Sequence, residues 1–236
     1  MKTLTLTIIA IIGFQLVVAQ QPIQQKQVEY LLQFKYQKTT TFENIDLETL
    51  NYIGSPYTND NYLAGEIYHK NKLVAENVPL RYNALVDEME FKPKFETPDS
   101  ESSALLKSPE IDVRIGSKVF VFVPYQGGVE KGGYFEVLRR GESYDLFKKY
   151  NKRYVPEQPA KTSMTKDRPA KFIDNPIYYI VRGDGKFIEL PDKSNKFSKL
   201  FSGNEKEIKN YIKSKNLDLK NEGDLIKVVS YLDTSL

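Results

Sequence analysis

The stretch from Gly54 to Lys92 constrains this chain most, because turn residues alternate there with short runs rich in Tyr, Leu, Val and Ile. Such runs, bounded by turn signals, are typical of strands in an antiparallel sheet. Gly65, inside the first run, predicts a bulge or a close approach of two backbones. The strands predicted here are Tyr62–Tyr68, Leu73–Glu76, Leu80–Ala84 and Glu88–Lys92, with a turn at His69–Lys72, which contains Asn71. The chain is therefore expected to be mainly β.

The same pattern continues on both sides of this stretch. Val119–Val123 is apolar at every position and predicts a central strand that is buried on both faces. Ser143–Val155 carries Lys and Arg and predicts an edge strand, with a helix over Tyr144–Tyr150 as the alternative. Loops are expected at Pro93–Pro109 and Pro156–Pro169. Further strands are predicted at Tyr30–Gln37, Ile111–Ile115, Lys118–Tyr125, Tyr134–Arg139, and at Ile177–Arg182 and Lys186–Leu190, which flank the hairpin signal Gly183-Asp184-Gly185.

After Pro191 the apolar residues adopt a helical period. Asn204 with Glu207, and Asn221 with Asp224, stand where helices would begin. The apolar stripes are Phe197, Leu200 and Phe201; Ile208, Tyr211 and Ile212; and Leu225, Val228, Val229 and Leu232. The fold class predicted is mainly β (α+β), an antiparallel β meander of about ten strands over residues 30–191. Residues 192–236 are expected to form a small C-terminal helical appendage packed on or beside the sheet.

Residues Met1–Ala19 have the features of a secretory signal peptide. Lys2 supplies the positive charge, an uncharged apolar run follows, and Val17-Val18-Ala19 provides small residues before a cut at Gln20. The run is shorter than the roughly 20 residues that a membrane span needs. We therefore expect an exported protein, periplasmic or extracellular, with a flexible lead-in over residues 20–29. Because the chain has no Cys, a lipoprotein anchor and a disulfide framework are not expected.

Several chemistries are hard to build from this composition. With one histidine, His69, and no Cys, neither a zinc cluster nor a Cys–His nucleophile is expected, and we predict no metal and no cofactor. Ser163-Met164-Thr165-Lys166 has S-x-x-K spacing but lacks its partner motifs. Gly127 to Gly132 has the glycine spacing of a phosphate loop but lacks the following Lys-Ser/Thr. Thr58–Asn61 lacks the distal Glu of a calcium loop, so we predict an ordinary turn.

Glu88 and Glu90 carry the enzyme alternative. Two residues apart on one strand, their carboxylates would lie about 7 Å from each other, which suits paired-carboxylate glycoside hydrolysis. They are expected to be exposed, opposite Met89 and Phe91, and dispensable for stability. The densest polar part of the sequence surrounds them, so the binding candidates here are Arg81, Tyr82, Asn83, Asp87, Glu88 and Glu90.

Charge is distributed unevenly along the chain. Residues 40–112 hold 14 acidic and 6 basic residues, whereas residues 138–171 hold 10 basic and 4 acidic ones. The two segments are expected to lie close together and attract each other. The alternative is a basic face for an anionic polymer, with Lys148, Lys152 and Arg153 as its candidate residues.

Some of these residues also form a pattern seen in other proteins. They are Gly54-Ser55-Pro56-Tyr57 with Asn59, Gly65, Pro79-Leu80-Arg81-Tyr82-Asn83, Asp87-Glu88-Met89-Glu90-Phe91 and Leu225-Ile226-Lys227 in a Lys-rich tail. On them, the chain resembles an uncharacterised family of secreted proteins from Gram-negative bacteria. The resemblance covers most of the chain and implies export, but no activity.

The function expected from the sequence is a non-catalytic binding or structural module of the periplasm or cell surface. Its partner would be a surface or periplasmic protein or an anionic polymer, and not a nucleic acid. One alternative is a carboxylate-dependent hydrolase of glycans or peptides that uses Glu88 and Glu90. Another is a carrier of small apolar ligands, which would need a closed barrel with a cavity.

Overall fold

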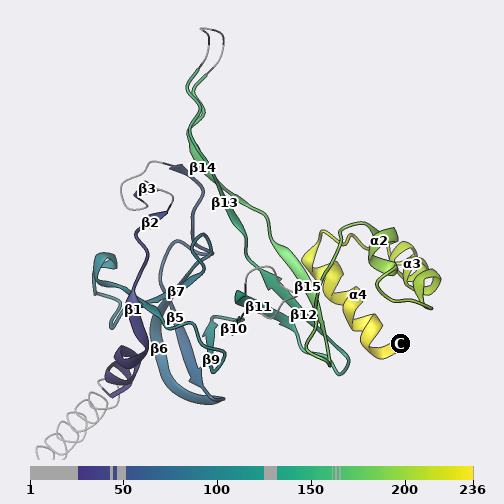
Figure 1. The fold of residues 1–236 in the computed structure, drawn as a ribbon, viewed down its shortest axis with the longest axis horizontal. Coiled ribbons are helices and arrows are strands. Elements are labelled where there is room, and N and C mark those ends of the chain that lie inside the picture. Colours follow the sequence, from purple (N-terminus) through teal and green to yellow (C-terminus); the bar gives the residue numbers. More distant parts are fainter. Residues whose placement is uncertain are drawn as a thin grey trace, which may run out of the picture.

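A computed structural model describes residues 26–42, 45–46, 52–124, 132–160, 162, 164 and 166–235. The fold is mainly β with a helical C-terminal end, which confirms the predicted fold class (Figure 1). The large sheet has 11 strands in the order β1-β8-β7-β6-β5-β9-β10-β11-β12-β15-β16, and each neighbouring pair is antiparallel. Its strands are β1 (Lys35–Gln37), β5 (Leu63–His69), β6 (Lys72–Asn83), β7 (Glu88–Phe91), β8 (Ser103–Leu105), β9 (Ile111–Ile115), β10 (Lys118–Val123), β11 (Gly133–Arg139), β12 (Tyr144–Lys149), β15 (Ile177–Arg182) and β16 (Phe187–Glu189).

Two small sheets accompany the large one. Strand β14 lies between β13, to which it is antiparallel, and β4, to which it is parallel. The second small sheet is the pair β2 and β3. These strands are β2 (Thr41–Phe42), β3 (Ile45–Asp46), β4 (Tyr52–Ile53), β13 (Lys152–Val155) and β14 (Ala170–Asp174), and the C-terminal helices are α2 (Ser194–Ser198), α3 (Glu205–Ser214) and α4 (Glu222–Ser235).

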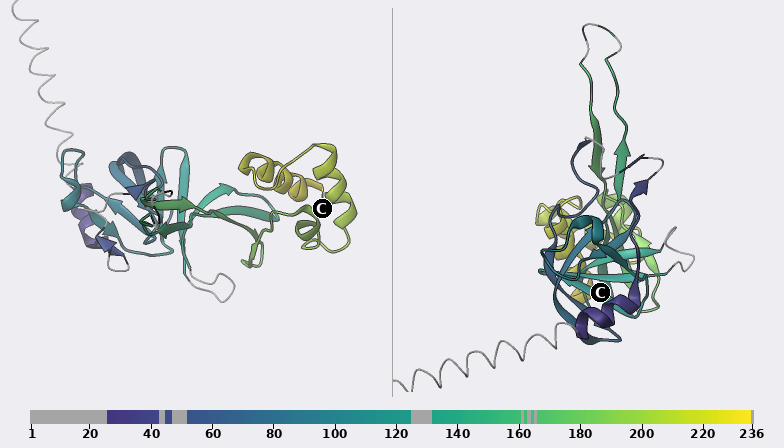
Figure 2. Two further views of the ribbon diagram at one scale, coloured as in Figure 1. Left: turned by 90° about the horizontal axis from the view of Figure 1, so that it is seen from above. Right: turned by 90° about the vertical axis from the view of Figure 1, so that its left-hand side faces the viewer.

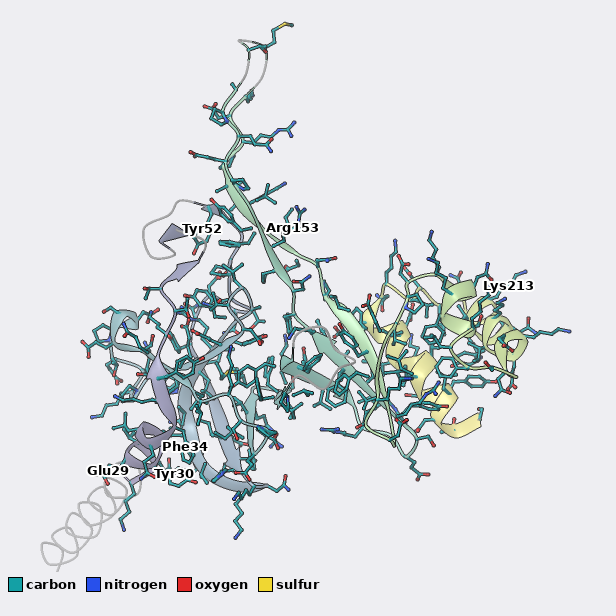
Figure 3. The ribbon with its side chains drawn as sticks, viewed as in Figure 1. Glu29, Tyr30, Phe34, Tyr52, Arg153 and Lys213 are labelled. Carbon is teal, nitrogen blue, oxygen red and sulfur yellow. The ribbon has the colours of Figure 1, made fainter. Side chains whose placement is uncertain are left out.

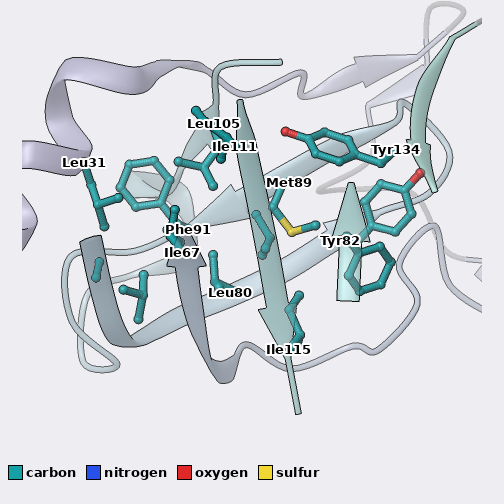
Figure 4. Packing of buried hydrophobic residues seen from close by; sticks show 14 of the residues in the cluster. Leu31, Ile67, Leu80, Tyr82, Met89, Phe91, Leu105, Ile111, Ile115 and Tyr134 are labelled. Carbon is teal, nitrogen blue, oxygen red and sulfur yellow. The ribbon is translucent and has the colours of Figure 1, made fainter. Parts of the chain in front are cut away.

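One end of the large sheet is curled around its own core. Leu105 of β8 and Tyr134 of β11 belong to the same buried cluster, although five strands separate β8 from β11 in the sheet order. Figure 4 shows this cluster, in which Met89 lies between Phe91 on one side and Tyr82 and Tyr134 on the other. Large side chains fill the space that a barrel-like curl would otherwise leave.

The other end of the sheet is covered by helices on one face. Leu146 of β12 and Ile180 of β15 pack against Phe197, Val228 and other buried residues of the helices. The neighbouring positions Phe147 and Tyr179 point to the opposite face and form a separate cluster with Phe135. This alternation follows from the two-residue period of a strand.

Several short-range predictions are confirmed. The turn between β5 and β6 has positive φ at both Lys70 and Asn71, and the Asp184 region joins β15 to β16 as a hairpin. At Gly65 the register shifts, and an added Cβ would lie 2.4 Å from the carbonyl oxygen of Arg114. Three helices form after Pro191, and the side chain of Asn221 caps α4 through the N–H of Asp224, whereas Asn204 makes no such side-chain bond.

The predictions near the N-terminus were partly wrong. Residues 26–31 are helical and a 3₁₀ turn, Leu32–Phe34, follows, so only Lys35–Gln37 is a strand and residues 26–29 are no flexible lead-in. The rings of Tyr30 and Phe34 lie 5.2 Å apart, and Leu31 is buried in the core. Tyr30 and Phe34 are four residues apart, a spacing that brings two side chains together on a helix. This contact outweighs the alternation of apolar residues that predicted a strand. Residues 1–19 lie outside the described part of the chain.

Other strand predictions also need correction. The two strands expected between Leu73 and Ala84 are one 12-residue strand, in which Asn77 has a φ of 55°. The loop Pro93–Pro109 contains β8. Strand β10 is central, but only Phe120 in it is fully buried, while Phe122 is half-buried. The expected edge strand Ser143–Val155 is instead β12, inside the sheet between β11 and β15, followed by β13 in another sheet.

Candidate functional site

The outer face of β6 and β7 carries a buried polar network centred on Glu90. Its carboxylate accepts hydrogen bonds from Arg81 Nη2 at 2.8 Å, from Tyr62 Oη at 2.8 Å and from Asn83 Nδ2 at 3.2 Å. Glu90 and Asn83 are fully buried, and Arg81 is 5 % exposed. The register places Arg81 directly opposite Glu90, so the pairing of β6 with β7 itself brings the two charges together.

Arg81 is held by more than this carboxylate. Its guanidinium lies between two tyrosine rings, 3.7 Å from the centre of Tyr57 and 4.2 Å from that of Tyr62. It also donates to the carbonyl oxygen of Asp60 and to the carboxylate of Asp99. Burial alone would lower the pKa of Arg81, but the adjacent Glu90 carboxylate raises the pKa above its ordinary value. The Arg81 guanidinium therefore stays positively charged and is held in place by the groups around it.

Glu88 is buried too, and its carboxylate lies in a different network. It accepts hydrogen bonds from the backbone N–H of Thr39 at 2.8 Å and from the Thr39 hydroxyl at 2.7 Å. The expectation that Glu88 and Glu90 are exposed was therefore wrong. The strand alternates as expected, but a second layer covers its outer face. The ring of Tyr57 lies against the guanidinium of Arg81, and Thr39 donates to the carboxylate of Glu88.

These contacts limit the chemistry of the two carboxylates. A glycosidase needs one carboxyl group to protonate a leaving group and another to reach the sugar or a water. Here both groups accept hydrogen bonds from neighbouring protein groups and lie almost entirely out of contact with solvent. The two carboxylates thus connect β6 and β7 to each other and to Thr39 and Tyr62, which is a structural role.

A second polar cluster surrounds Tyr82 and Asp87. The Tyr82 hydroxyl donates to Asp87 Oδ1 at 2.6 Å, the N–H of Tyr134 donates to the same oxygen, and Lys149 lies 3.9 Å from Asp87 Oδ2. Burial lowers the pKa of Lys149, although Asp87 opposes that shift. Among the described residues, the buried hydroxyl of Tyr134 has no hydrogen-bond partner. The sequence placed Tyr82 and Asp87 in one candidate group, but gave no signal that Tyr134 and Lys149 would join them.

The basic candidates do not form an open patch. Lys148 binds Glu222 of α4 at 2.6 Å, and Lys152 binds Asp174 at 2.6 Å. The contact between Lys149 and Asp87 joins the basic segment, residues 138–171, to the acidic segment, residues 40–112, as the sequence predicts. The partners of Lys148 and Lys152 lie outside that acidic segment. Arg153 alone of the three predicted binding residues is exposed.

Arg153 lies on a feature that the sequence did not reveal, a hairpin arm that leaves the body between β12 and β15. Strands β13 and β14 form its stem, and Figures 1 and 2 show it projecting far from the sheet. Tyr52 and Arg153, labelled in Figure 3, mark where the stem passes β4. From Pro156 to Pro169 every residue that the structure describes is exposed. The sequence predicts only a Pro-containing loop here, because the polar residues of this segment lack strand alternation.

The base of the arm is firmly anchored. Phe172 packs its ring 4.7 Å from that of Tyr52 and 5.4 Å from that of Tyr154. Gly54, at a φ of 84°, lets the chain pass so close to Phe172 that a Cβ would lie 2.9 Å from its carbonyl oxygen. Gly54 therefore allows the body to pack closely against the base of the arm.

The remaining motifs carry no site. His69 is half-buried, with Nδ1 2.6 Å from the Tyr30 hydroxyl and Nε2 3.3 Å from Glu110. Within Thr58–Asn61, the Asn59 side chain accepts a hydrogen bond from the Thr58 hydroxyl and donates one to the carbonyl oxygen of Asn61. Residues 163 and 165 and the glycine loop up to residue 131 lie outside the described residues. Within the part that is described, no group of three metal-ligating side chains occurs and no helix is long and apolar enough to cross a membrane.

The comparisons with known proteins do not extend this picture. No family model matches the chain, and no match was found among the curated proteins or among the solved structures. The geometry described above is thus the basis for assigning a role.

Proposed function

We propose that the protein is an exported, non-catalytic binding module, and that its hairpin arm is the element that contacts a protein partner. Export rests on the signal-peptide pattern of residues 1–19, and on the resemblance to secreted proteins of Gram-negative bacteria. The binding role rests on one observation, the exposure of every described residue from Pro156 to Pro169 on a projecting hairpin.

The energetics of the arm support this role. An isolated two-stranded hairpin is at best marginally stable in water, because it buries little apolar surface. Beyond Ala170, where the pairing with β4 ends, the arm is held by its own bonds, such as the mutual backbone pair of Gln158 and Arg168 and the bond from the Ala160 N–H to Asp167. Both edges of such a ribbon offer unpaired backbone groups, which a partner strand can bind.

The two alternative functions have less support. A carboxylate-dependent hydrolase would need Glu88 and Glu90 at an accessible surface, and both are buried in hydrogen-bond networks. A carrier would need a ligand cavity inside the curled sheet, where Tyr82, Phe120 and Tyr134 instead pack against each other. A glycan hydrolysis activity that is lost in a folded Glu90→Gln protein would favour the hydrolase.

The binding role can be tested by site-specific cross-linking in the producing cell. A photo-reactive amino acid at Met164, which is 95 % exposed on the arm, should give a discrete adduct with one protein. The matched control is the same amino acid at Leu73, which is 47 % exposed on β6. Equal adducts at both positions, or none at Met164, would contradict the proposal.

A shortened arm gives the second half of the test. Replacing residues 159–167 by Asn-Gly keeps the Gln158–Arg168 pair and closes it with a two-residue hairpin turn. We expect this variant to fold with the thermal stability of the parent and to lose the partner. Retained binding would place the contact elsewhere on the surface.

A further inference from the structure

The helical C-terminal end carries an excess of positive charge that the rest of the molecule does not neutralise. Residues 193–215, which include α2 and α3, hold seven lysines and two glutamates. Both glutamates are engaged, since Glu205 accepts from the N–H of Gly203, and Glu207 from the hydroxyl of Tyr231 on α4. In the described part of the chain none of the seven lysines forms an ion pair. Figure 3 shows many nitrogen-tipped side chains around α2 and α3.

A groove of about 440 Å³ lies within this basic region, between the start of α2 and the C-terminal half of α3. Lys209 and Lys213 stand on its α3 side, one helical turn apart, and Ser194 and Asn195 stand on its α2 side. Asn216 closes one end, and Ile212 and Leu217 are its apolar members. Every polar side chain of the groove can donate a hydrogen bond, and no carboxylate lines it.

We infer that this groove is a binding site for a soluble ligand that carries neighbouring phosphate groups. Side chains one turn apart on a helix are about 5–6 Å apart at Cβ, so two ammonium groups can hold adjacent phosphates of one ligand. The amide and hydroxyl groups opposite them can donate to further phosphate oxygens. The inference is independent of the arm and of its partner, because the groove lies on the helical end of the molecule (Figure 1).

The shape of the site favours a soluble oligophosphate over a membrane surface. A helix that binds at a bilayer places large apolar side chains into the interface beside its cationic residues. The large exposed apolar side chains of the described residues all lie outside 193–235. A concave groove also matches a small ligand better than a flat layer of headgroups.

Calorimetric titration of the full chain with tripolyphosphate tests the inference. We expect binding at about 50 mM salt that weakens clearly at about 200 mM, because the contacts are ionic. Lys209→Gln with Lys213→Gln should weaken binding about tenfold, or ~1.4 kcal/mol. Lys209→Arg with Lys213→Arg keeps the charges, so it should retain binding and shows that the helix tolerates substitution.

The control removes the same charge elsewhere. Lys72 and Lys94 are exposed on the β-rich end, and Lys72→Gln with Lys94→Gln should leave the affinity within about twofold. Equal weakening in both double variants would mean attraction by net charge alone and would overturn the site. Absence of tripolyphosphate binding at low salt would overturn it as well. Binding to anionic phospholipid vesicles without binding to tripolyphosphate would replace the proposal by a membrane contact.

Discussion

At the scale of single residues, the ion pair of Arg81 and Glu90 is the most consequential contact. It is almost completely buried, so removing one partner leaves the other charge in a low-dielectric environment. Glu90→Gln should destabilise the protein by about 3–5 kcal/mol. Urea denaturation measures the loss, and Glu96→Gln, at an exposed position, is the matched control. An unchanged midpoint for Glu90→Gln would mean that Asp60, Asp99 and the tyrosine rings hold Arg81 unaided.

Two glycines give a paired test of local packing. An added Cβ at Gly65 would lie 2.4 Å from the Arg114 carbonyl oxygen and 2.6 Å from Leu80 Cδ1, whereas a Cβ at Gly183 has no other atom within 4 Å. Gly65→Ala should therefore cost about 1–3 kcal/mol, as overpacking does, and Gly183→Ala should cost almost nothing. Thermal unfolding of the two variants decides this. Equal stabilities would show that β5 and β9 can separate without penalty.

Glu88 and Glu90 illustrate how burial escapes a local sequence pattern. The alternation of Glu88, Met89, Glu90 and Phe91 correctly placed the two glutamates on one face. It could not show that the Tyr57 ring and Thr39 cover that face, because a local pattern does not contain contacts with distant segments. In the sequence, a polar residue that is buried and hydrogen-bonded cannot be distinguished from one that is exposed to solvent.

At the scale of elements, one carboxylate attaches α4 to the sheet. Asp233 accepts hydrogen bonds from the backbone N–H groups of Glu142, Ser143 and Tyr144, and from Arg139 at 2.7 Å. Its side chain is 4 % exposed. Burial alone would raise the pKa of Asp233, but the hydrogen bonds from these backbone groups and from Arg139 hold the pKa well below its usual range.

This attachment predicts a pH-dependent stability. A carboxyl group whose pKa is lower in the folded state stabilises the fold above its unfolded pKa of about 3.9, and the contribution is lost as the pH falls through the folded value. Asp233→Asn should cost about 1.5–3 kcal/mol near neutral pH, and the difference from the parent should shrink below about pH 4. Chemical denaturation across this range, with the exposed Glu157→Gln as control, measures it. A difference that stays constant with pH would exclude the charge as the cause.

The elements themselves differ in how well the sequence predicts them. Turns that need a special backbone conformation were found, such as Asn71 and the Gly183–Gly185 hairpin, because Asn and Gly favour positive φ. The edge strand was misplaced, because Lys148 and Lys149 suggest solvent. In the structure these lysines reach Glu222 and Asp87 with their long side chains while their backbones lie inside the sheet.

At the scale of the whole molecule, the protein has two main cores on one continuous sheet. One core surrounds Tyr82 and Phe120 inside the curled strands, and the other surrounds Phe197 and Val228 between the helices and the sheet. The change of period after Pro191 predicted the helical end. The curl of the sheet and the projecting arm did not follow from the sequence, since both depend on which strands pair over long distances.

Two cores on one sheet raise the question of whether they unfold together. Phe197 and Phe120 are both essentially fully buried, so truncating either to Ala should cost about 3–5 kcal/mol. The two clusters share no residue and are joined through the strands β10 to β12. Regions with their own buried contacts often open as separate cooperative units. We therefore expect Phe197→Ala to accelerate amide hydrogen exchange in α3 and α4, with little change in β5, β6 and β9.

Phe120→Ala is the reciprocal variant. It should accelerate exchange in β5, β6 and β9, because their side chains pack around Tyr82 and Phe120, and it should leave α3 and α4 close to the parent. If each substitution instead accelerates exchange equally in both regions, the sheet couples the cores into one cooperative unit. The helical end, with its basic groove, would then be as rigid as the curled sheet, since opening it would require unfolding of the entire molecule.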